Sequence, residues 1–207
     1  MLTATILRDA EPTLAAIGTE PFLTALAENR LPDAALGRWV REDTHFLRTL
    51  RRMIALLIAE APTEAAVDVI AGAYPALQSE LDRFAEEAER LGEDLDREPA
   101  EVTRRFDGLL MESARAGFAE GIGTYWAAEV AYLEAWSAVR RRIGLNEPYA
   151  GWIENWTSDG FRDFVADLGA VVDEHGDPEA VRRGADEVFA LERELWRHCL
   201  AGDPAPS

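Results

Sequence analysis

Helical periodicity runs through almost the whole chain and excludes most fold classes. Apolar residues recur at spacings of three and four, whereas no segment shows the strict alternation of a half-buried strand. Prolines, glycines and capping residues divide this pattern into segments. We expect helices from Leu31–Asp33 to about Glu60, from Pro62 to about Gly92 with a break at Tyr74–Pro75, from Pro99 to about Ala116, between Gly117 and Gly144, from Ser158 onwards, and from Asp177–Pro178 to about Leu200.

These segments predict one all-α domain. The chain has 207 residues, enough for a sizeable core, and contains neither an internal repeat nor a dividing linker. We expect residues 1–201 to form the domain and residues 202–207 to fray. Asp9 comes too early for a signal peptide, and the longest apolar run, from Met53 to Ala59, is too short to span a bilayer. With a single cysteine as well, a soluble cytoplasmic protein without membrane contact is expected.

The chain is strongly acidic, and its charge disfavours nucleic acids as partners. The formal net charge is -18, and all 21 basic residues are arginine. Two origins remain open, namely adaptation to high salt or a GC-rich genome that favours arginine codons. In either case clustered positive charge is lacking, because the arginine runs at 48–52 and 140–142 are short and typical of solvated helix faces. We therefore expect no nucleic-acid partner.

Three acids lie on apolar helix faces. Each stripe has spacings of three, four or seven residues and contains one carboxylic acid. A lone buried carboxylate is costly, so three from distant segments suggest a shared polar interior, as in a small-molecule pocket. The alternative is that each acid sits at a helix edge and pairs with a nearby arginine. The stripes are Tyr125, Glu129, Tyr132 and Trp136; Trp39, Asp43, Phe46, Leu50 and Leu57; and Val188, Glu192, Leu195 and Cys199.

Motifs for metals, nucleotides and serine nucleophiles are absent from the sequence. The three histidines form no HxH or HExxH motif, and Glu194 and His198 are a weak candidate pair for a metal. No glycine-rich phosphate loop and no GxSxG elbow occurs. The sequence therefore predicts no metal and no cofactor.

Four segments resemble the TenA/thiaminase II family, in the family's order, across residues 6–200. They are "PFLTALAENRLPDAALGRWVREDTHFLRTLRRMIALLIAEAP" (21–62), "AAEVAYLEAW" (127–136), "YAGWIENWTSDGF" (149–161) and "LERELW" (191–196). The resemblance implies a heme-oxygenase-like helical bundle without heme, usually assembled as a homotetramer. It also implies hydrolysis at the methylene carbon of an aminopyrimidine for thiamin salvage. The substrate would be thiamin or a breakdown product such as 4-amino-5-aminomethyl-2-methylpyrimidine, and the product the hydroxymethyl compound.

The same resemblance implies roles for individual residues. Asp43 matches the acid that binds the pyrimidine amino group and ring nitrogen, and Glu192 matches the acid that protonates the ring. Tyr132 matches the tyrosine on the nucleophile's helix. The aromatic pocket positions are matched by Phe46, Phe106 and Trp156.

One departure concerns the nucleophile. The family's cysteine aligns with Ala128, and Cys199, on another helix, is expected to be a small buried residue. A branch of the family lacks that cysteine and is thought to use glutamate. Glu129 adjoins the vacant position and can serve as nucleophile or as base for water, with Glu134 as the weaker candidate.

Two other functions remain open on this fold. A binding or regulatory protein would have lost catalysis together with the cysteine. An oxidase is the second alternative, although the missing histidine ligands disfavour a diiron version.

Overall fold

The computed structural model describes residues 1–145 and 148–202, and all of its regular structure is helical. This confirms the predicted all-α class. Of the tail expected at 202–207, all but Gly202 lies outside the described residues. The helices are α1 (Leu2–Ile17), α2 (Pro21–Ala27), α3 (Asp33–Glu60), α4 (Glu64–Gly72), α5 (Tyr74–Leu91), α6 (Glu101–Ala116), α7 (Phe118–Ile143), α8 (Ala150–Asn155), α9 (Asp159–His175) and α10 (Pro178–Ala201).

Capping residues begin two of these helices where the sequence predicts. The Ser158 side chain accepts a hydrogen bond from the Phe161 amide at the start of α9, and Asp177 does the same for Ala180 in α10. One predicted boundary is wrong, because α6 begins at Glu101 and Pro99 precedes its cap. The reason is that the Ala100 amide donates to the buried carboxylate of Glu42, which holds this residue in an extended conformation. The periodicity argument provides no boundaries for α1, α2 and α8.

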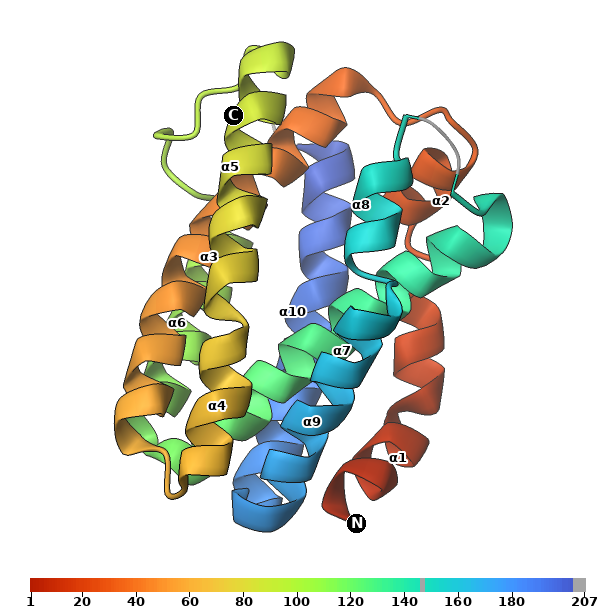
Figure 1. Cartoon of the computed structure of the whole chain (residues 1–207). Helices are drawn as coiled ribbons and strands as arrows, with labels where there is room; N and C mark the ends of the chain where they lie inside the picture. The colour runs from red at the N-terminus through yellow and green to blue at the C-terminus, as the bar shows by residue number, and fades with distance from the viewer. Residues whose placement is uncertain (146–147, 203–207) are drawn as a thin grey trace.

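The long helices form a bundle around α7 and α10. Helix α7 packs against α10, α6 and α9, while α3 packs against α5 and α6 (Figure 1). The α4–α5 pair and α9 come next to one another at one side of the bundle, where α4 contacts α9. None of the helices in the described ranges is long and apolar enough to cross a membrane.

Aromatic side chains form a large part of the interior. Trp39 lies at the centre, and its ring centroid is 5.5 Å from that of Trp136 and 5.2 Å from that of Trp152. Trp156 stacks on Trp136 at 4.9 Å. Close-packed rings of this kind leave little freedom for the side chains that they support.

Buried ion pairs fix the helices that carry the acids. Glu42, which is fully buried, pairs with Arg41 at 2.9 Å and accepts a hydrogen bond from the Thr103 hydroxyl. These contacts hold the residue before Asp43 against α6. On α10, Arg193 pairs with Glu20 at 2.7 Å and thereby ties the helix of Glu192 to the start of α2.

Candidate active site

A cavity of about 330 Å³ lies between α3, α5, α7 and the stretch from the end of α8 to the first turns of α9. Its volume is within the range of small-molecule sites. Exposed small residues, Gly72, Ala76 and Gly160, form part of its rim, whereas most of the wall is apolar or aromatic. The lining residues are Asp43, Phe46, Leu47, Leu50, Gly72, Ala73, Ala76, Leu77, Glu80, Tyr125, Ala128, Glu129, Tyr132, Asn155, Trp156, Ser158, Gly160, Phe161 and Phe164.

Asp43 reaches this cavity from α3. The residue is 1% exposed, and its Oδ1 has no hydrogen-bond partner among the described residues. Burial raises the pKa of Asp43 to about 8, the neighbouring Tyr132 hydroxyl opposes the shift, and the charge of Glu80 adds to it. Asp43 is therefore largely protonated near neutral pH and has an oxygen free for a ligand.

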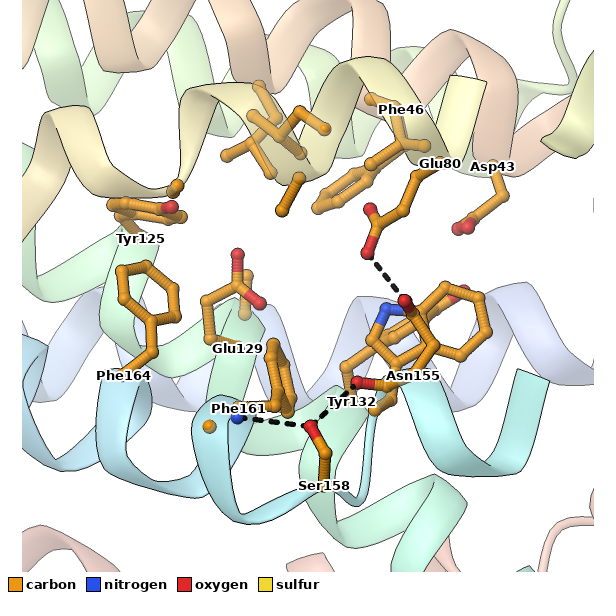
Figure 2. A pocket seen from close by; sticks show the side chains of 18 of the residues that line it. Asp43, Phe46, Glu80, Tyr125, Glu129, Tyr132, Asn155, Ser158, Phe161 and Phe164 are labelled. Carbon is orange, nitrogen blue, oxygen red and sulfur yellow. Dashed lines mark hydrogen bonds between the residues drawn. The ribbon is translucent and has the colours of Figure 1, made fainter. Parts of the chain in front are cut away.

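Glu129 points into the middle of the cavity from α7 (Figure 2). Burial raises its pKa well above the ordinary value, and the charges of Glu80, Asp43 and Glu192 raise it further. Ala128, which the sequence resemblance aligns with the cysteine of the TenA/thiaminase II family, also lines the cavity. The small side chain leaves room beside Glu129 for a ligand or water.

Glu80 is a cavity acid that the sequence analysis missed. Asn155 Nδ2 donates to its Oε1 over 2.7 Å, and the Glu80 side chain faces the space between Asp43 and Glu129 (Figure 2). Burial raises the pKa of Glu80, while the hydrogen bond from Asn155 opposes the shift. Glu80 follows the buried Leu77 by three residues and precedes the buried Phe84 by four. This apolar stripe is the sequence pattern that could have identified Glu80 as a buried acid.

Glu192 is buried near the cavity without lining it. The residue is 2% exposed, and its Oε1 has no hydrogen-bond partner in the described part of the chain. Burial raises the pKa of Glu192 to about 8, and the charge of Asp43 contributes in the same direction. Glu192 is therefore largely protonated near neutral pH, and an ionised Asp43 favours that form further.

Aromatic residues line the cavity next to its acids. Phe46, Tyr132 and Trp156 line the cavity, and the Tyr132 hydroxyl accepts a hydrogen bond from Trp39 Nε1 at 3.0 Å. Phe106 does not line it and instead contacts Phe46 edge-on, with centroids 5.0 Å apart. The rings therefore form a wall against which a flat heterocycle can pack.

The sequence left open that the acids on the apolar stripes pair with nearby arginines. The structure shows other partners for those arginines. Arg41, near Asp43 in sequence, pairs with Glu42 and Glu93, and Arg193 pairs with Glu20. None of the residues lining the cavity is basic. Such a site favours a ligand that carries positive charge or accepts a proton.

The remaining reactive residues lie elsewhere. Cys199 is fully buried, and burial raises the pKa of its thiol well above the ordinary value, as expected for a small core residue. Glu194 of the weak metal pair forms an ion pair with Arg105. Residues 1–145 and 148–202 contain no cluster of three or more side chains suited to a metal ion.

Comparison with known proteins identifies relatives of this arrangement. The sequence profile of the TENA/THI-4/PQQC family matches residues 8–178. A TenA homologue from Pyrococcus furiosus is 26% identical and superposes with a TM-score of 0.89 over 96% of this chain and 100% of its own. A TenA homologue from P. horikoshii OT3 is 21% identical, with a TM-score of 0.87 and coverage of 98% and 100%. A putative TenA-like thiaminase from Sulfolobus solfataricus P2 is 12% identical, with a TM-score of 0.84 and coverage of 99% and 98%. No curated protein matches the sequence.

Proposed function

Because the chain belongs to the TENA/THI-4/PQQC family, we propose that it hydrolyses an aminopyrimidine at an exocyclic methylene carbon. The reaction is R–CH2–NH2 + H2O → R–CH2–OH + NH3, in which R is the 4-amino-2-methylpyrimidine ring. The observation that carries this proposal is the approach of Asp43 from α3 and Glu129 from α7 into one cavity with aromatic walls. Figure 2 shows the two acids at separate places along the cavity, with Glu80 between them.

Asp43 is the group that would hold the pyrimidine. Its unpartnered Oδ1 can hydrogen-bond the ring nitrogen or the amino group, and Phe46 and Trp156 can pack against the ring. With a pKa of about 8, Asp43 carries a proton for the ring nitrogen. Glu192 does not line the cavity, so we propose that it acts beside Asp43 as a carboxylic acid whose pKa is raised by burial and by the charge of Asp43. Protonation withdraws electrons from the ring and makes the methylene carbon electrophilic.

Glu129 is the group that would activate water. The water oxygen forms the new C–O bond and gives its proton to the Glu129 carboxylate. The electron pair of the C–N bond leaves with nitrogen, which takes up a proton as ammonia departs. The raised pKa of Glu129 makes it a strong base once ionised, and a cationic substrate in the cavity favours the ionised form.

Product analysis in heavy-oxygen water tests the proposal. The aminomethylpyrimidine should yield ammonia and the hydroxymethyl product in equal amounts, with one ¹⁸O atom in the new hydroxyl. Binding of the pyrimidine without any product would contradict hydrolysis. That outcome would favour a non-catalytic pyrimidine-binding protein, the candidate to which Ala128 at the cysteine position points.

A further inference from the structure

The cavity meets the surface between the joint of α4 with α5 and the first turn of α9. Gly72 ends α4, Ala76 lies in the first turn of α5, and Gly160 is the second residue of α9. All three line the cavity and are exposed, whereas Phe161 and Phe164, the aromatic residues that α9 adds to the lining, are half-buried. Helices α4 and α9 contact one another and lie side by side in Figure 1. The exposed residues of the lining therefore come from two helix ends that are close in space.

The residues deeper in the cavity are closed off from solvent. Asp43 is 1% exposed, Trp156 3% and Ala128 4%. A small molecule that contacts these residues is itself largely covered by protein. It therefore has to pass the exposed rim on its way in and on its way out.

The fold does not require the two glycines of the rim. A Cβ added at Gly72 or Gly160 would meet no atom within 4 Å, and neither residue has a left-handed φ. Gly123, in contrast, packs against α10, and a Cβ there would come to 2.5 Å from Cγ2 of Val181. Glycine within a helix is destabilising relative to alanine. The missing side chains at the rim thus have no cause in packing or backbone conformation, and they leave the cavity open at this place.

We propose that ligands enter and leave the cavity here, and that Gly72, Ala76 and Gly160 determine which ligands pass because their small size sets the width of the entrance. Residues at an entrance touch the ligand only in passage. They change the rates of association and dissociation by the same factor and leave the dissociation constant as it was. The inference concerns access to the cavity and goes beyond the proposed reaction.

A thiol placed inside the cavity measures access without any substrate. Ala128→Cys adds a sulfur at a position that lines the cavity, and the natural cysteine, Cys199, is fully buried and should not react in the folded protein. The reagent is methyl methanethiosulfonate, which is small and neutral. The thiolate attacks its methylthio sulfur and displaces methanesulfinate, so mass spectrometry should show the gain of one methylthio group per chain.

Gly72→Leu and Gly160→Leu, each combined with Ala128→Cys, should slow this modification about tenfold because a leucine side chain then occupies the entrance. Gly108→Leu and Gly151→Leu are the matched controls and should react at the rate of Ala128→Cys alone. Both are helical glycines whose Cβ would meet no atom within 4 Å, and neither lines the cavity. All four changes replace a helical glycine and should keep or raise the melting temperature, so a slower reaction does not reflect unfolding.

Stopped-flow binding of the aminomethylpyrimidine adds a second readout. Tryptophan fluorescence, to which Trp156 in the wall contributes, reports the association and dissociation rates. In Gly160→Leu and Ala76→Leu both rates should fall by the same factor at an unchanged dissociation constant. Weaker binding at an unchanged association rate would make these positions part of the binding wall and would overturn the entrance.

The results distinguish this inference from the proposed function. Modification of the cavity thiol that slows only in the rim variants would retain the entrance, even if no pyrimidine is bound or hydrolysed. Hydrolysis together with modification that is equally fast in all variants would overturn the entrance and retain the reaction. A cavity thiol that the reagent does not reach in the folded protein would also overturn the entrance.

Discussion

Asn155 Nδ2 donates a 2.7 Å hydrogen bond to Glu80 Oε1 and thereby joins the end of α8 to α5 beside the cavity. The bond holds a carboxylate whose charge raises the pKa values of Asp43 and Glu129. Burial is the larger cause of both shifts, and the charge of Glu80 adds to it for the two acids that the proposed reaction uses.

Glu80→Gln should shift the pH profile of kcat/KM towards lower pH. The amide keeps an oxygen for Asn155 but removes the negative charge, so the pKa values of both Asp43 and Glu129 should fall. The activity rises with pH as Glu129 ionises and falls as Asp43 loses its proton, and both of these pH midpoints should move to lower pH. Kinetics from pH 5 to 10 measure the shift. Glu86→Gln, an exposed change on the same helix, should leave the profile in place; a profile unmoved in Glu80→Gln would refute the coupling.

The stability of the protein should fall as pH rises through neutrality. The folded-state pKa values of Asp43 and Glu192 are raised to about 8, so the folded state binds more protons than the unfolded chain. Ionising the two buried acids lowers the free energy of unfolding. This loss is absent below the pKa values of the unfolded chain, grows from about pH 4 to pH 8, and reaches its full size above pH 8. Melting temperatures across this window should decrease, and Asp43→Asn should flatten the dependence. An equal slope in the parent and the variant would show that Asp43 titrates normally.

Cys199→Ala should leave hydrolysis essentially intact. The thiol is fully buried, its pKa is raised, and it does not line the cavity. Turnover is measured before and after treatment with a thiol-alkylating reagent, and neither the variant nor the treated parent should lose activity. A folded but inactive Cys199→Ala protein would return the cysteine to the mechanism.

Molar potassium chloride should raise the melting temperature by several degrees. The net charge of -18 creates repulsion in the compact state, and added ions screen it. Chloride is preferred to sulfate here because sulfate strengthens apolar burial in any protein. A midpoint that does not change between low and molar salt would leave codon usage as the explanation for the arginine-rich composition.

The all-helical class and most helix boundaries could be predicted, because the spacing of apolar residues, the capping residues and the prolines act locally along the chain. Asp43 and Glu129 could be identified for the same reason, as an acid on an apolar stripe can be seen in the sequence. A stripe shows which face of a helix is buried, but it does not show what the side chain meets there. Glu192 and Phe106 share the expected faces and still lie outside the cavity lining.

The rest of the site depends on tertiary contacts. Glu80 was obscured because α5 carries other acids, such as Glu86 and Glu89, that are exposed. Asn155 and Ser158 belong to a short helix and a turn, where no periodic pattern indicates direction. Tyr125 was visible in its stripe, but only the packed structure shows that its hydroxyl has no partner in the part of the chain described.

The central claim is that Glu129 performs the chemistry in a pocket where Asp43 holds the ring. The most direct measurement compares kcat and the dissociation constant of the aminomethylpyrimidine for the parent, Glu129→Gln and the control Glu134→Gln, whose side chain does not line the cavity. Glu129→Gln should still bind the compound but lose about a hundredfold or more in kcat, since its amide cannot take a proton from water. Glu134→Gln should match the parent in both quantities. Full turnover by Glu129→Gln would contradict the account.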